Sequence, residues 1–142
     1  MCGFVGIYSA KQQPSFNQNI VETMRDSMSH RGPDGAGIWV SPEQNCILGH
    51  RRLSIVDLSS SAAQPMSNHD GSIIIVFNGE IYNHKEIRRE LSQYESIPWR
   101  TDHSDTEVIL YAYQKWGLNA LNKFYGIKMT YGNSNPHAET VP

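Results

Sequence analysis

The chain has 142 residues, enough for one domain with a genuine core but too few for two. Twelve Lys and Arg against fourteen Asp and Glu give a formal net charge of −2, so composition indicates neither a nucleic acid nor an anionic membrane as a partner. The sequence has no signal-peptide pattern, no apolar stretch near the roughly 18 residues of a membrane span, two cysteines and no metal-ligand spacing, so we expect a cytoplasmic protein without a metal site.

The first predicted elements are a strand and a helix. Apolar and small residues fill both sides of an extended segment over residues 2–9, which predicts a strand at the start of the chain. A helix follows, where Ser15 and Gln18 have capping-box spacing, and it should end near His30. Its apolar residues recur at helical intervals: Ile20, Val21, Met24 and Met28. The segment RGPDGAG, residues 31–37, then predicts a loop that can approach a ligand closely.

Four short β-rich runs come next, separated by turn or polar residues. They are residues 36–40, 46–50, 52–58 and 72–77. Such a series favours an antiparallel meander. One sheet with helices on its outer side, an α+β fold, accounts for these runs and the helices around them.

Two further helices are predicted after the last run. The first begins near Asn83, and its apolar face has three members: Ile87, Leu91 and Tyr94. The second is capped by Ser104 and Glu107 and ends at Gly117. Its apolar stripe has four members: Ile109, Ala112, Tyr113 and Trp116. Residues 125–142 sustain no period of either kind, which predicts an irregular or disordered tail.

Cys2 is a candidate nucleophile. Removal of Met1 would give its thiol an α-amino group a few ångströms away, with an ordinary pKa of about 7.7 to 8.0 against about 8.5 for the thiol. One residue would then supply both nucleophile and base, the arrangement of the N-terminal nucleophile enzymes. The alternative is that Cys2 is a small strand residue without chemical consequence.

Asn78 and Gly79 are candidates for stabilising an oxyanion. They end an apolar strand, so a side-chain amide and a backbone N–H would project from adjacent residues, as acyl transfer from an amide requires. An ordinary Asn-Gly hairpin turn is the alternative.

Two charged residues could hold an amino-acid substrate. Arg52 begins a predicted strand, where its planar guanidinium could engage a carboxylate through two hydrogen bonds. Asp105 lies in the first turn of a predicted helix, so its carboxylate could bind an ammonium group or stabilise the helix dipole.

Five segments occur together in a distinctive order: MCGFVGIY, HRGPDGAG, GHRRLSIVDLSSSAAQPM, IVFNGEIYNH and SDTEVIL. With them, the sequence resembles the class II glutamine amidotransferase domain of glutamine-hydrolysing asparagine synthetases over about residues 2–124. The motif RLSIVDLS, followed by QPM and FNGEIYN, separates this family from other class II amidotransferases.

The resemblance implies an N-terminal nucleophile hydrolase with an αββα sandwich of antiparallel sheets. Cys2 would be the nucleophile after removal of Met1, and Asn78 and Gly79 would form the oxyanion hole. The resemblance also assigns substrate-binding roles to three charged residues: Arg52 at the α-carboxylate, Asp105 near the α-ammonium, and Glu80 in the same pocket. The loop at residues 31–37 would pack beside the nucleophile. Glutamine would be hydrolysed through a γ-glutamyl thioester, giving glutamate and ammonia.

The same resemblance sets expectations for cofactors and partners. The glutaminase step needs no cofactor, while ATP and Mg belong to the family's synthetase domain, which amidates aspartate and is absent from this sequence. Glutamine is the expected small-molecule substrate and a synthetase domain or chain the possible partner, with neither nucleic acid nor membrane.

The resemblance breaks after residue 124. Family members continue there with further strands, so we expect a partial domain over residues 2–124, incomplete at the C-terminus, and a divergent tail over 125–142. Two alternatives to an active glutaminase stay open. One is an inactive fragment or interaction module that pairs with a synthetase chain, and the other is an amidotransferase for a sugar or cell-envelope precursor.

Overall fold

The computed structural model describes residues 2–10, 17–54 and 60–127, which form an α+β fold with antiparallel sheets and three α-helices. The strands are β1 (Gly3–Tyr8), β2 (Gly35–Val40), β3 (Cys46–Arg52), β4 (Met66–Ser67), β5 (Ile74–Ile75), β6 (Glu80–Ile81) and β7 (Gly126–Ile127). The helices are α1 (Gln18–Ser27), α2 (His84–Tyr94) and α3 (Asp105–Trp116), with 3₁₀ turns η1 (Ser60–Ala62) and η2 (Gly117–Asn122). Within the described ranges no helix is both long and apolar enough to cross a membrane.

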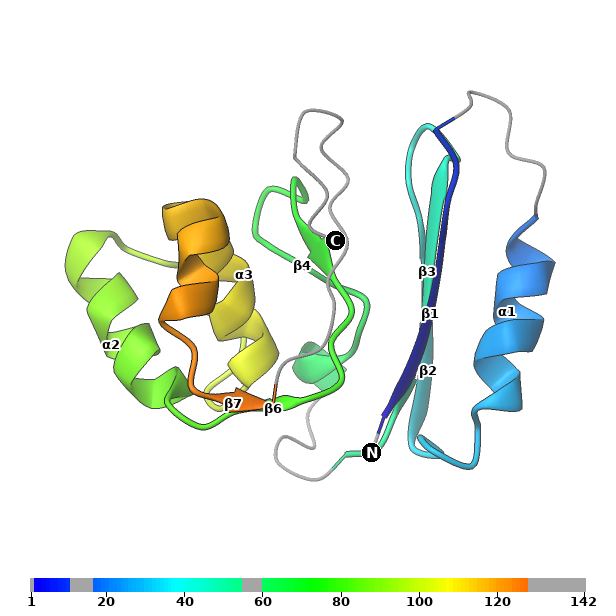
Figure 1. Ribbon diagram of the computed structural model, residues 1–142, viewed down its shortest axis with the longest axis horizontal. Coiled ribbons are helices and arrows are strands. Elements are labelled where there is room, and N and C mark those ends of the chain that lie inside the picture. The colour runs from blue at the N-terminus through cyan, green and yellow to red at the C-terminus, as the bar shows by residue number, and fades with distance from the viewer. Residues whose placement is uncertain (1, 11–16, 55–59, 128–142) are drawn as a thin grey trace.

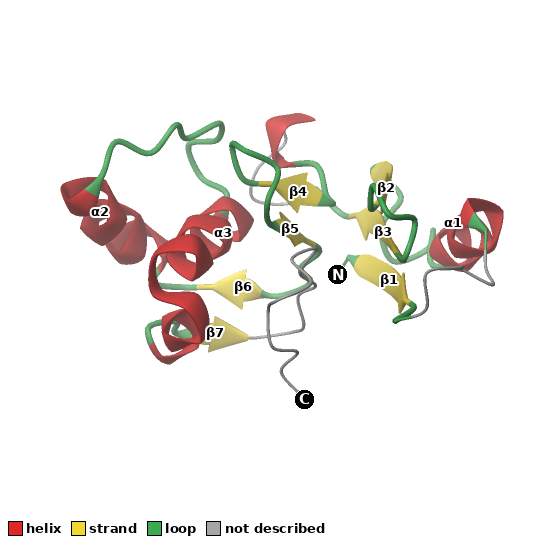
Figure 2. Ribbon diagram, turned by 90° about the horizontal axis from the view of Figure 1, so that it is seen from above, coloured by secondary structure: helices red, strands yellow, loops and turns green. Residues whose placement is uncertain are grey.

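The largest sheet has the strand order β1-β3-β2, with both pairings antiparallel. Helix α1 covers one face of it, and the opposite face is turned toward the layer that contains β4 to β7 (Figure 1). Helices α3 and α2 lie beyond that layer, and the view from above has the same succession of layers (Figure 2). The strands are therefore enclosed between helices on both outer sides.

The predicted strands are confirmed at residues 2–9, 36–40 and 46–50, but the meander is wrong. Strand β3 continues through Arg52 and pairs on both sides, with β1 and with β2. Strand β5 pairs instead with β4, a strand that the sequence did not predict. Residues 55–59 of the predicted run 52–58 lie outside the described residues.

The apolar run before Asn78 is buried on both sides, which is why its sheet was misassigned. Ile74 and Val76 pack with Cys46 and Leu48 of the large sheet. Ile75 and Phe77 point the other way, into the cluster beneath α3. A run buried on both faces carries no alternation from which its neighbours could be predicted.

The helix caps and faces are partly as predicted. The cap of α1 is Asn17, whose side chain accepts a hydrogen bond from the backbone N–H of Ile20 at 3.1 Å. Ser15, the predicted cap, lies outside the described residues. Val21 is fully buried, but Ile20 and Met24 are 48% and 45% exposed, so only part of the predicted face meets the sheet.

Helices α2 and α3 have the predicted extent, with two corrections. Tyr94 is 60% exposed, because it ends the helix beneath the ammonium group of Lys115 rather than in the core. Helix α3 is buried over every residue from 106 to 112, a wider surface than the predicted stripe, because it lies between the strand layer and α2. Gly117 ends it with a φ of 55°, as predicted.

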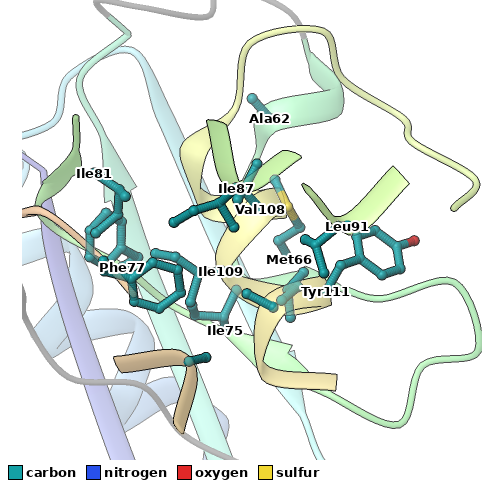
Figure 3. Packing of buried hydrophobic residues seen from close by; sticks show 14 residues of the cluster. Ala62, Met66, Ile75, Phe77, Ile81, Ile87, Leu91, Val108, Ile109 and Tyr111 are labelled. Carbon is teal, nitrogen blue, oxygen red and sulfur yellow. The ribbon is translucent and has the colours of Figure 1, made fainter. Parts of the chain in front are cut away.

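The main core lies between α2, α3 and the strand layer. Its side chains interdigitate, with Phe77 and Ile81 at one end and Leu91 and Tyr111 at the other (Figure 3). Gly126–Ile127 extend this layer by pairing with β6, although residues from 125 onward were expected to be irregular. Residues 128–142 lie outside the described residues.

Candidate active site

Cys2 lies at one end of the large sheet, immediately before β1. Its Sγ accepts a hydrogen bond from the backbone N–H of Leu53 at 3.3 Å and lies 3.7 Å from the Leu53 carbonyl oxygen. Because Gly3 pairs with Arg51, continuing the antiparallel register by one residue sets Cys2 opposite Arg52. Residues directly opposite share a face, so the thiol and the guanidinium stem start from the same face of the sheet.

That face is the inner one. His50 lies two residues before Arg52 in β3, and Leu48 lies two residues before His50, so all three share this face. Leu48 packs against the strand layer. On the other side of Arg52, the pairing of β2 with β3 sets Gly35 opposite it, and Gly35 has no side chain. Half-buried Arg52 is therefore flanked by a thiol and by a glycine at the mouth of the space between the layers.

The loop at residues 31–37 packs against this end of the sheet and lies beside Cys2, as the resemblance implied. Arg31 Nε donates to the Cys2 carbonyl oxygen at 3.3 Å. The backbone N–H of Asp34 donates to the Arg52 carbonyl at 3.0 Å, and its carboxyl accepts from the N–H of Ser54 at 2.8 Å. Gly32 packs so closely on the backbone that a Cβ there would collide with the Arg51 carbonyl, so this position requires glycine.

Asn78 and Gly79 join the strand layer to the same end of the molecule. Asn78, half-buried, follows Ile74 and Val76 at intervals of two, on the side that faces the large sheet. Strand β6, which comes directly after Gly79, lies at the end of the molecule where β1 starts (Figure 1). Asn78 and Gly79 immediately precede this strand.

The hairpin alternative for Asn78 and Gly79 is wrong. The strand before them pairs with β4 and the strand after them with β7, so they do not connect paired strands. Gly79 is also not among the glycines with positive φ, which a type I′ hairpin turn requires at both central residues.

Asp105 is tied to the same segment. One of its carboxyl oxygens accepts a hydrogen bond from the backbone N–H of Ile81 at 3.0 Å, and the other lies 3.4 Å from the Thr106 hydroxyl. It is the first residue of α3, so it joins the helix N-terminus to β6. Glu80 lies in β6, exposed, with its backbone paired to Ile127.

Two residues near the site and one on the helical side were not singled out from the sequence as functional. Leu53 contributes only backbone atoms, which no side-chain pattern reports. His50 is 1% exposed, and burial lowers its pKa to about 4, with a further lowering by the charge of Arg52. Glu107 was predicted only as a capping partner, yet it is equally buried.

The two cysteines have different environments. Cys46 is 8% exposed within the inner face, and burial raises the pKa of its thiol. Cys2 is half-buried and lies at the sheet end. Within the ranges that the structure describes, no group of three or more His, Cys, Asp and Glu side chains could hold a metal ion.

Comparison of the sequence with known proteins identifies the family of this chain. The sequence profile of the glutamine amidotransferase domain matches residues 1–131, past residue 124 where the resemblance was expected to end. The chain therefore belongs to the glutamine amidotransferase domain family.

Particular relatives narrow the similarity. The chain is 37% identical over 140 residues to glutamine-hydrolysing asparagine synthetase 1 of Bacillus subtilis (strain 168), covering 96% of this chain and 21% of that protein. It is 39% identical over 128 residues to glutamine-hydrolysing asparagine synthetase B of Escherichia coli (strain K12), covering 89% of this chain and 22% of that protein. An amidase of Gibberella zeae is 37% identical over 106 residues, covering 75% of this chain and 15% of that protein. The chain spans about a fifth of the length of the first two relatives.

Proposed function

We propose that this chain hydrolyses glutamine to glutamate and ammonia, with Cys2 as the nucleophile once Met1 has been removed. The observation that carries the proposal is the register that sets Cys2 opposite Arg52, with the Leu53 N–H donating to the thiol sulfur. Nucleophile and carboxylate-binding cation then share one face, as a short amino-acid substrate requires.

The reaction proceeds in two halves. The α-amine of Cys2 takes the thiol proton, and the sulfur attacks the γ-carboxamide carbon to form a tetrahedral oxyanion. The Asn78 side-chain amide and the Gly79 N–H donate to that oxyanion. Its collapse breaks the carbon–nitrogen bond, and the proton held on the α-amine leaves with the nitrogen as ammonia. Water then hydrolyses the γ-glutamyl thioester, which gives glutamate and restores the thiol.

The substrate's other charges meet the remaining residues of the site. Arg52 binds the α-carboxylate, with room beside it because Gly35 has no side chain. Asp105 lies near the α-ammonium, and Glu80 completes the pocket. Support for Asp105 comes from its hydrogen bond to Ile81, which holds its carboxyl group close to Asn78 and Gly79.

The layers support an N-terminal nucleophile fold, an αββα sandwich with the nucleophile at the end of one sheet. The names of the relatives support a destination for the ammonia, the ATP-dependent synthesis of asparagine. A synthetase domain or chain would then be the partner that holds ATP and Mg, and the glutaminase step itself uses no cofactor. The two free cysteines support a reducing, cytoplasmic compartment.

Intact mass spectrometry tests the proposal directly. The full chain, with Met1 removed, is mixed with glutamine and quenched in acid, and we expect a γ-glutamyl adduct together with released ammonia. Cys2→Ala should give neither, while Cys46→Ala, which removes the other thiol, should give both. An unmodified protein that releases no ammonia would favour the interaction module, and turnover that survives Cys2→Ala would exclude the thioester.

A further inference from the structure

His50 is the most deeply buried histidine beside the proposed site. It is 1% exposed and lies on β3, opposite Phe4 on one side and Gly37 on the other. This row is next to the row of Cys2 and Arg52 on the same inner face. Among residues 2–10, 17–54 and 60–127, neither ring nitrogen has a hydrogen-bond partner of ordinary geometry.

A buried imidazole with an unpaired N–H is costly, and most such groups in proteins are paired. The ring is neutral at physiological pH, because burial and Arg52 lower its pKa to about 4, so one nitrogen carries a proton and the other does not. The backbone of Phe77 acts in the opposite sense and raises this pKa, as a carbonyl oxygen near the ring does.

Phe77 is also held through its own N–H, which belongs to the preceding peptide. Its N–H donates to Gln64 Oε1 at 2.5 Å, and its ring is buried in the main core. Gly37, opposite His50, lies so close to Gln64 that a Cβ there would collide with the Gln64 carbonyl. His50, Gln64 and Phe77 therefore meet where the large sheet approaches the strand layer.

The carbonyl of Phe77 belongs to the peptide whose nitrogen is that of Asn78. We propose that His50 is a positioning residue. Its ring N–H holds the Phe77 carbonyl oxygen, and this bond fixes the direction in which the side-chain amide of Asn78 and the backbone N–H of Gly79 point. This inference rests on the proposed function, since it is the developing oxyanion that needs these donors aligned. Such a bond would tighten around the oxyanion, and it agrees with the lack of a partner of ordinary geometry for either ring nitrogen among the described residues.

A merely structural role predicts a different result, because a histidine that only fills space affects stability and not the balance between kcat and KM. Four variants separate the two roles: His50→Phe keeps the ring without the donor, His50→Asn and His50→Gln each keep an amide near one ring nitrogen, and Cys46→Ala removes packing from the same face without a donor. Glutamine hydrolysis, thermal unfolding and the rate of Cys2 alkylation by iodoacetamide are measured for each.

We expect His50→Phe to lower kcat at least tenfold, with KM and the alkylation rate within about threefold of the unmodified chain, because only the transition state uses the aligned donors. One of the two amide variants should keep most of kcat, and which one identifies the donating nitrogen. Cys46→Ala should lower the unfolding temperature without lowering kcat.

Folded His50→Phe with unchanged kcat would overturn the inference, as would two folded amide variants no more active than His50→Phe. If His50→Phe does not fold, the amide variants decide, and equal kcat in both overturns it. An unmodified chain that does not hydrolyse glutamine would instead refute the proposed function, and this inference with it. The inference fails by itself only if the unmodified chain hydrolyses glutamine and the His50 variants behave as just described.

Discussion

Two buried polar side chains, one on each side of the molecule, have opposite environments. Glu107 in α3 and His50 in β3 are each 1% exposed. The carboxyl oxygens of Glu107 accept from the backbone N–H of Arg100 at 2.7 Å and from the N–H and hydroxyl of Thr101 at 2.9 and 2.6 Å. Neither nitrogen of His50 has a partner within the described part of the chain.

The two regions differ in how their buried polar groups are held. On the helical side, Glu107 satisfies three donors and holds the segment before α3, and core residues surround it. At the sheet end, the loop at residues 31–37 is tied to the sheet by Arg31 Nε, which donates to the Cys2 carbonyl, and by the Asp34 N–H, which donates to the Arg52 carbonyl. A fully satisfied buried group maintains a shape, whereas an unsatisfied one needs an explanation of its own, and on the helical side Arg88 Nη1 and the Tyr111 hydroxyl also lack a partner among the described residues.

The largest expected effect is on activity at the sheet end. Cys2→Ala should reduce ammonia release to background and leave the free energy of unfolding within about 0.5 kcal/mol, because Cys2 is only half-buried and makes no core contact. Ammonia release and urea denaturation measure the two quantities. A loss of several kcal/mol would mean that Cys2 is a structural residue.

On the helical side the expected effect is on stability. Glu107→Ala should lower the free energy of unfolding by about 4 kcal/mol, because it leaves three donors, two of them buried, without an acceptor. Glu90→Ala, at a helix residue whose carboxyl makes an exposed ion pair with Lys123, is the matched control and should cost less than about 1 kcal/mol. Equal losses in urea denaturation would remove the contrast between the two regions.

A pH titration of stability tests the buried environment of His50. The pKa of His50 is about 4 in the folded chain and 6.5 ordinarily, so the unfolded chain binds the proton first. Stability should therefore be complete above about pH 6.5 and fall as the pH drops toward 4, with about 1.4 kcal/mol lost per pH unit. The total is about 3 kcal/mol. His50→Gln should lack this step while keeping the response of the carboxyl groups, and an identical profile would show that the folded His50 titrates ordinarily.

The sequence could predict what is local. Strand β1, the hairpin of β2 and β3, and helices α2 and α3 follow from alternation, helical spacing and capping, and Gly117 from the need for a positive φ. Strand pairing beyond the hairpin could not be predicted, since residues 72–77 are apolar on both sides and β4 is only two residues long. Tyr94 was misjudged because its place on the helical face did not reveal that the core ends before it.

The site was predictable in its residue types and not in its geometry. Cys2, Arg52, Asn78 and Gly79 were named as site candidates from the sequence, but their places in the fold depend on the register of β1 and β3 and on the layer to which Asn78 belongs. The Leu53 backbone donor and the missing partners of His50 arise only when the layers meet. Both are tertiary properties, without a local pattern to report them.

The smallest expected effect on stability concerns Asp105, whose structural and substrate-binding roles the sequence left open. Asp105→Asn keeps an oxygen that can accept from Ile81, and it removes a negative charge from the N-terminus of α3. The free energy of unfolding should fall by less than about 1 kcal/mol. KM for glutamine should rise about tenfold, because the α-ammonium loses its anion, which is worth about 1.4 kcal/mol.

Asp102→Asn, at an exposed carboxyl just before the same helix, is the matched control and should change neither quantity. Steady-state kinetics and urea denaturation give the two quantities, and a tenfold rise in KM without a matching loss of stability would tie Asp105 to the substrate. An unchanged KM would leave it only the bond to Ile81, and would return it to the structural side of the comparison, beside Glu107.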